Sequence, residues 1–169
     1  MGSKSRLAIV AAIAALGAGL AAPSDGLGAG APKCFSSQLT LKFVTFQGAT
    51  GGRFWEMAFK NTSTTCTLRG FPKVKLLDQH GHAIHKSIGH WTLVPVRTVT
   101  LARNKLAFFV FRYTDGGFCP GMSFDAARFE FTPPNDHAGF VYNPVPKNHG
   151  VPSLCTGSAR VTAVSAKKI

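Results

Sequence analysis

The amino-acid sequence predicts an all-β fold, a two-sheet antiparallel β-sandwich with two disulfides, which follows a cleaved N-terminal signal helix. Three observations lead to this prediction. Short segments that alternate apolar and polar residues recur along the chain, with turn residues between them. No helical apolar stripe occurs outside the N-terminal segment. Four cysteines follow an export signal, and this combination favours disulfides.

Residues 1–31 are expected to form a signal peptide and a short linker. Lys4 and Arg6 precede an uncharged apolar run, and small residues place the cleavage between about 21 and 31. An uncleaved membrane anchor is the alternative, but the run is short for a spanning helix, so we expect no transmembrane segment in the mature chain. Cys34 follows a lysine, which does not suit a lipoprotein site. The chain is therefore predicted to be secreted or associated with the cell envelope.

Residues 32–165 have room for one sandwich domain with a sizeable core, and residues 166–169 form a basic tail. Without Lys4, Arg6 and Asp25, the net charge is +11. The basic residues are scattered, whereas proteins that bind nucleic acid concentrate them on one stripe or helix, so no nucleic-acid partner is expected. The charge favours an anionic envelope polymer or acidic lipid head groups, and simple solubility explains it equally well. No feature of the sequence indicates the oligomeric state.

The four cysteines allow three pairings. We favour the sequence-local one, Cys34–Cys66 with Cys119–Cys155, in which each bond stabilises the fold by roughly 3–4 kcal/mol in the chain-entropy model. A structural zinc site is the alternative, but no two cysteines have the short spacing that such sites normally use.

The expected strands follow from the period-two pattern. The first two form a hairpin around a glycine-rich turn, with Trp55, Met57 and Phe59 on its inward face. A type I turn is expected at 78–81, and residues 135–158 are expected to be a long loop. The expected strands are 39–46, 53–61, 74–78, 83–86, 91–94, 97–101, 105–113, 124–132 and 159–163.

One short motif links two of these strands. It comprises Cys66, Leu68, Gly70, Phe71 and Pro72, and its glycine permits a positive φ while its proline donates no hydrogen bond. The motif is therefore expected to end one strand, turn sharply and start the next at a sheet margin.

This motif, an Asp78-x-x-Gly81 turn, a Val99-x-Leu101 strand and a later cysteine pair resemble a bacterial family. It is the domain-of-unknown-function family numbered 4232, whose members are mostly exported actinobacterial proteins. The resemblance covers about residues 34–164. It implies an immunoglobulin-like sandwich, an envelope or extracellular location and the same disulfide pairing, and it implies no established activity.

A histidine-rich stretch from His80 to His90 is a candidate metal site. If this stretch is extended, His80 and His82 share a face near Asp78, and imidazole with carboxylate suits zinc or copper. Water-facing turn residues are the alternative explanation. We name no firm metal ligand and expect no cofactor.

Catalysis lacks its usual residues. No nucleophile elbow occurs. A glycosidase needs two carboxylates close to each other, whereas the candidates Glu56 and Glu130 lie on different predicted strands. Trp55, Trp91 and Phe71 are candidates for an aromatic platform that binds a ligand, although we expect Trp55 in the core.

We therefore predict a non-catalytic module of the envelope or extracellular space that binds a protein or an anionic envelope polymer. The alternatives are a metal-binding module that uses the His80–His90 segment, and a hydrolase.

Overall fold

Two long neighbouring strands, β1 (Leu39–Ala49) and β2 (Gly52–Asn61), form the predicted hairpin in the computed structural model, which describes residues 30–144 and 150–169. The predicted signal peptide lies outside the described residues. The hairpin turns at Thr50 and Gly51, which both have positive φ, as a tight antiparallel turn requires. A bulge at Val44 shifts the register, and it explains why the alternating pattern breaks there.

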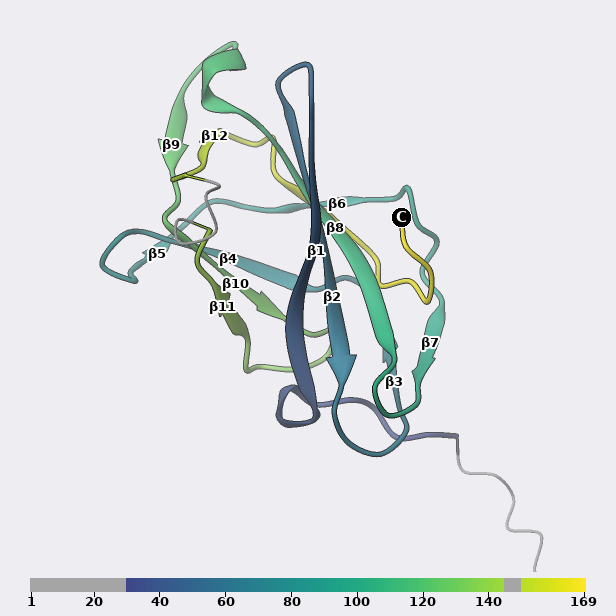
Figure 1. Cartoon of the computed structure of the whole chain (residues 1–169). Helices are drawn as coiled ribbons and strands as arrows, with labels where there is room; N and C mark the ends of the chain where they lie inside the picture. The colour runs from purple at the N-terminus through teal and green to yellow at the C-terminus, as the bar shows by residue number, and fades with distance from the viewer. Residues whose placement is uncertain (1–29, 145–149) are drawn as a thin grey trace, which may run out of the picture.

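The hairpin belongs to a five-stranded sheet in the order β1-β2-β8-β13-β6 (Figure 1). The additional strands are β6 (Gly89–Trp91), β8 (Leu106–Thr114) and β13 (Arg160–Thr162). All neighbouring pairs in this sheet are antiparallel except β6 and β13, which are parallel. β8 is buried over most of its length, as expected for a strand that is covered on both faces.

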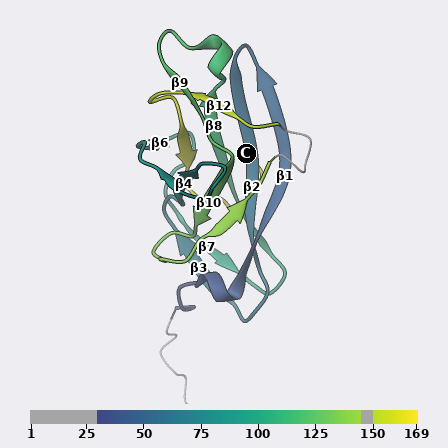
Figure 2. The same cartoon turned by 90° about the vertical axis from the view of Figure 1, so that its left-hand side faces the viewer.

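A second sheet has four strands in the order β11-β10-β4-β5, and Figure 2 shows β4 and β10 beside the layer of β1 and β2. Its strands are β4 (Lys73–Leu77), β5 (Ala83–Ile84), β10 (Arg128–Thr132) and β11 (Phe140–Tyr142). Two small sheets pair β3 (Cys66–Arg69) with β7 (Thr98–Leu101), and β9 (Ser123–Asp125) with β12 (Ser153–Cys155). The fold is therefore a β-sandwich with two disulfides, as predicted.

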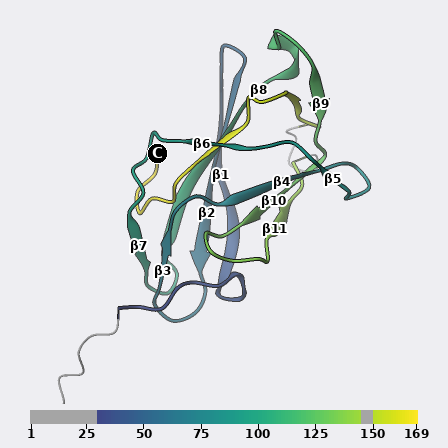
Figure 3. The same cartoon turned by 180° about the vertical axis from the view of Figure 1, so that it is seen from behind.

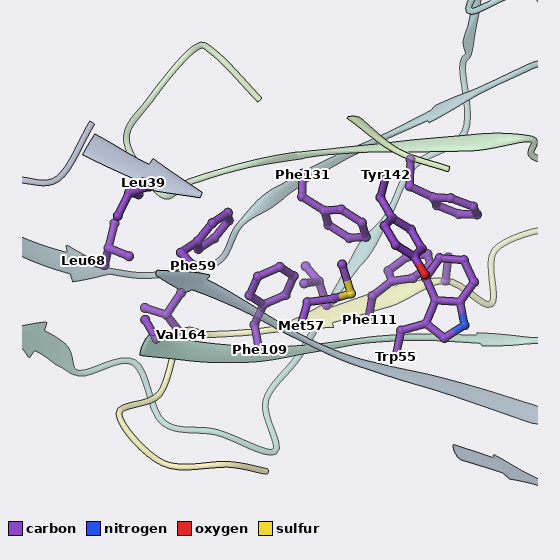
Figure 4. Close-up of a cluster of buried hydrophobic side chains, with 14 of the residues drawn as sticks. Leu39, Trp55, Met57, Phe59, Leu68, Phe109, Phe111, Phe131, Tyr142 and Val164 are labelled. Atoms are coloured by element: carbon purple, nitrogen blue, oxygen red, sulfur yellow. The ribbon is translucent and has the colours of Figure 1, made fainter. Parts of the chain in front are cut away.

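Aromatic side chains fill the space between the two main sheets (Figure 4). Trp55 of β2 is fully buried and contacts Phe129 of β10 and Tyr142 of β11, at ring-centroid distances of 4.7 and 5.5 Å. Phe59 and Phe109 stack at 4.9 Å. The prediction that Trp55, Met57 and Phe59 face inward is confirmed.

Three predicted boundaries are wrong because short strands depend on distant partners. The strand expected at 91–94 instead ends at Trp91, where its pairing with β13 ends. The strand expected at 124–132 is divided, because β9 pairs with β12 whereas β10 pairs with β4 and β11. The loop expected at 135–158 contains β11 and β12, each only three residues long.

The motif from Cys66 to Pro72 connects β3 to β4 as expected. Gly70 has φ +110°, and its carbonyl oxygen accepts a hydrogen bond from the Val164 N–H. Leu68 and Pro72 are buried. The motif was predicted to start a strand at the margin of a sheet. β5 pairs with only the last two residues of β4, so this prediction holds for the start of β4 but not for its end.

Both predicted disulfides are present, Cys34–Cys66 and Cys119–Cys155. The first attaches the N-terminal segment to β3, and the second attaches the loop after β8 to β12. In the described ranges, no helix has the length and apolar character needed to span a membrane.

Candidate functional site: the outer face of the five-stranded sheet

The outer face of the five-stranded sheet carries side chains that point away from the core. The register places Phe54 of β2 opposite Arg112 of β8, and Arg112 opposite Arg160 of β13. In the next row, Glu56 lies opposite Val110. One face of the sheet therefore carries aromatic, acidic and basic side chains from β2, β8, β13 and β6, the last of which contributes Trp91.

Arg112 lies against two aromatic rings. Its guanidinium carbon is 5.6 Å from the Phe54 ring centroid and 5.1 Å from that of Trp91. The electron-rich ring faces attract a cation at such distances. Nε of Arg112 is buried without a hydrogen-bond partner, and none of the carboxylates in the described ranges pairs with this arginine. The rings therefore hold a guanidinium group that is in no ion pair with a described carboxylate.

Arg160 adds a second positive charge beside Arg112. It is exposed, and its side chain lies across the backbone of β6 at Gly89, where a Cβ atom would overlap Nη1 of Arg160. Like charges directly opposite each other on neighbouring strands destabilise a sheet.

A hollow of about 240 Å³ lies on this face, and two of its lining residues, Phe54 and Trp91, also contact Arg112. Its apolar lining comprises Phe54, Trp91, Leu93, Val110 and Ile169, and its polar lining comprises Thr45, Gln47 and Glu56. The residue Glu56 is only 6 % exposed, and its Oε1 accepts a hydrogen bond of 2.8 Å from the Ile169 N–H. Figures 1 and 3 show that the C-terminal end lies on the opposite side of β8 from β4 and β10.

Most acidic side chains of the described ranges are engaged within the fold. Asp115 pairs with Arg53 at 2.9 Å and Glu130 with Lys75 at 3.1 Å. The carboxylates of Glu56, Asp78 and Asp136 accept hydrogen bonds from backbone N–H groups. The lysines and arginines of the described ranges without a carboxylate partner are Lys33, Lys42, Lys60, Arg69, Lys73, Lys86, Arg97, Arg103, Lys105, Arg112, Arg128, Arg160, Lys167 and Lys168.

The metal candidates Asp78, His80 and His82 meet in the turn between β4 and β5. Asp78 Oδ1 accepts the N–H groups of His80 and His82, and its Oδ2 lies 3.3 Å from Nδ1 of His82. Burial opposes ionisation of Asp78, but the N–H groups of His82 and His80 outweigh it and lower its pKa. The hydrogen bond from the Gly81 N–H to the Asp78 carbonyl oxygen shows a β-turn at the predicted position.

The histidine segment does not converge on one point. His90 lies in β6, where its ring stacks on Phe71 at 3.9 Å. Within residues 30–144 and 150–169, no three His, Cys, Asp or Glu side chains are grouped so that they hold a metal ion. The predicted metal-binding module therefore has no ligand set among these residues, because the turn uses the Asp78 carboxylate to cap its own backbone.

The other sequence-level candidates are also separated. Glu56 and Glu130 belong to different sheets. Trp55 lies in the core, whereas Trp91 lies on the outer face, so the proposed platform of Trp55, Trp91 and Phe71 does not form. The aromatic partner of Trp91 is Phe54, at 6.0 Å between ring centroids.

Sequence reasoning missed the arrangement around Arg112. The available signal was an arginine in the most apolar strand, at a position that the alternation places opposite the core side. Its partner Arg160 could not be recognised, because only the register between β8 and β13 joins residues so distant in sequence.

These features define a disulfide-stabilised β-sandwich whose five-stranded sheet carries, on its outer face, two arginines without a carboxylate partner among the described residues. The chain belongs to the family described as Domain of unknown function (DUF4232), whose profile matches residues 34–165. The comparison with curated proteins gave no match, and neither did the comparison with solved structures.

Proposed function

We propose that this chain is exported and acts as a non-catalytic module that binds an anionic polymer of the cell envelope. The observation that carries this proposal is the distribution of charge. Most described carboxylates are engaged within the fold, whereas fourteen of the lysines and arginines that the structure describes have no carboxylate partner. A surface with this excess of positive charge attracts polyanions over a distance set by the ionic strength.

Two further features support an extracellular setting. Both disulfides suit an oxidising compartment, and the sequence of residues 1–31 has the pattern of an export signal. An exported protein meets the polymers of the envelope rather than nucleic acid, so we take envelope polymers as the polyanion.

A protein partner is the second candidate, and one surface feature favours it. Phe118 and Met122, in the loop between β8 and β9, are 61 % and 78 % exposed. Contiguous exposed apolar patches are typical of protein interaction sites, and these two exposed side chains belong to one loop. The double substitution Phe118→Ser and Met122→Ser would abolish binding to such a partner but would leave binding to a polyanion unchanged.

Isolated cell walls provide the test of the main proposal. Protein recovered after export of the full chain is mixed with intact walls, and with walls from which acid treatment has removed the anionic polymers. We expect retention on intact walls at low salt, release as salt rises, and no retention on the stripped walls. Equal retention on both preparations would contradict the proposal.

A further inference from the structure

The outer face of the five-stranded sheet carries two arginines on neighbouring strands and an apolar hollow. Arg112 and Arg160 are cross-strand neighbours, and no described carboxylate pairs with either. Guanidinium groups bind phosphate and carboxylate through paired N–H donors. The Phe54 and Trp91 rings hold the Arg112 guanidinium, so little conformational freedom is lost when it binds an anion.

The hollow admits only part of a larger ligand. Its volume, about 240 Å³, lies below the ~300 Å³ at which pockets for whole small molecules begin. A single ring from a longer chain is compatible with this size. Phe54 and Trp91 contribute both to the hollow and to the Arg112 contact, so the Arg112 guanidinium is close to the hollow. Arg160 is its neighbour on the next strand.

Glu56 distinguishes between an acyl chain and a hydroxylated ring. Its carboxylate lines the hollow, and Oε2 receives no hydrogen bond from a described residue. An acyl chain would displace water from this carboxylate without replacing the lost hydrogen bonds, which is costly. Hydroxyl groups of a sugar would donate to Glu56, while their ring carbons pack against Trp91 and Leu93.

We propose that this face binds one sugar ring of an anionic glycan, with the ring in the hollow and its carboxylate or phosphate on Arg112 and Arg160. The inference rests on the proposed function and assigns its binding subsite. The ligand class is a pyranose that bears one acidic group. Glu56 binds ring hydroxyls, and the two arginines bind the anion.

Tryptophan fluorescence measures binding at this site directly. The chain contains two tryptophans, of which Trp55 is fully buried in the core and Trp91 lines the hollow. A ligand in the hollow therefore changes the emission of Trp91. The full chain, recovered after export, is titrated with tri-galacturonate as the carboxylate probe, glucose 6-phosphate as the phosphate probe and maltotriose as the neutral control.

We expect saturable spectral changes with at least one acidic probe and no comparable affinity for maltotriose. Arg112→Gln and Arg160→Gln should each weaken binding by about tenfold, the effect of losing a charge-assisted hydrogen bond. Arg128→Gln is the matched control, because Arg128 is a half-buried arginine of the other sheet without a carboxylate partner. Since Arg160 is exposed, its variant keeps the test valid if Arg112→Gln fails to fold.

Other results would overturn the inference. If maltotriose binds as tightly as the acidic probes, the arginines do not select the ligand. If Arg112→Gln and Arg160→Gln bind like Arg128→Gln while intact walls still retain the protein, the subsite is wrong and the proposed function stands. A response of Trp91 to phosphatidylglycerol vesicles, without a response to the sugars, would show that a lipid occupies the hollow. Failure to bind walls and sugars alike would overturn both proposals.

Discussion

The side chain of Asn61 offers the sharpest test of how the fold is held together. Asn61 ends β2 and is fully buried. Its Nδ2 donates to the carbonyl oxygens of Thr64 at 2.7 Å and Leu101 at 2.8 Å, and its Oδ1 accepts from the Ser63 N–H at 2.8 Å. Although Asn61 begins a glycosylation acceptor sequence, a glycan on Nδ2 is incompatible with these contacts.

The substitution Asn61→Asp preserves the shape of the side chain and removes both donors. The new carboxylate would face two carbonyl oxygens in a buried setting, so we expect a loss of about 3–5 kcal/mol in the free energy of unfolding at neutral pH. For a domain of this size, the midpoint of thermal unfolding should fall by roughly 10–20 °C.

The loss should depend on pH in a defined direction. Burial and the two carbonyl oxygens favour the protonated form, so the introduced carboxyl has a raised pKa in the folded state. The folded variant therefore binds more protons than the unfolded chain, and its stability relative to the wild type rises as pH falls. The deficit should be complete above the folded-state pKa and smallest below about pH 4.

Urea denaturation of the wild type and the variant at several pH values measures this effect. Thr64→Asp is the control, because it adds the same charge at an exposed neighbouring position whose side chain makes no hydrogen bond. A deficit of less than about 1 kcal/mol for Asn61→Asp, below the effect of one buried unsatisfied group, would refute the reasoning. A deficit that does not change with pH would do the same.

Three other perturbations have defined outcomes. Gly70→Ala should cost about 1–3 kcal/mol because φ is +110° there, whereas Gly121→Ala, in open space, should be neutral in the same urea titration. Since the pKa of Asp78 is lowered in the folded state, its contribution to the free energy of unfolding is complete above about pH 4 and is lost as pH falls further. The free energy of unfolding of Asp78→Asn should therefore fall less steeply than that of the wild type as the pH is lowered below about 4. Replacing Cys119 and Cys155 by serine should lower stability by about 3–4 kcal/mol without abolishing β circular dichroism.

Local sequence patterns were sufficient to predict the long strands. The hairpin of β1 and β2 could be predicted because its alternation, its glycine-rich turn and its inward aromatic residues agree with one another. The disulfide pairing followed from sequence proximity and from the family resemblance, and both bonds are present. In each case the determining residues are close in sequence or share a simple period.

The remaining strands could not be predicted because their hydrogen bonds come from distant segments. Strand β11 has only three residues, and it is fixed by pairing with Phe129–Phe131. β6 is fixed by its parallel pairing with β13. Thr162 is fully buried, and its hydroxyl accepts a hydrogen bond from the Val110 N–H, which links β13 to β8.

The candidate site shows the same limit. The sequence identified an excess of positive charge but not where two arginines face each other, because the pairing of Arg112 with Arg160 depends on the register of β13. For the histidine stretch, the sequence instead indicated a proximity that the structure does not show. His80 and His90 are close in sequence, but one lies in a turn and the other stacks on Phe71, so sequence proximity overstated their proximity in space.

The dissociation constant for polygalacturonate, measured as a function of salt concentration, tests the central claim most directly. If unpaired lysines and arginines bind the polyanion, affinity should fall steeply between about 50 and about 500 mM NaCl as the charges are screened, and neutral dextran should not bind at any salt concentration. An affinity that is independent of salt, or equal for dextran, would contradict the claim.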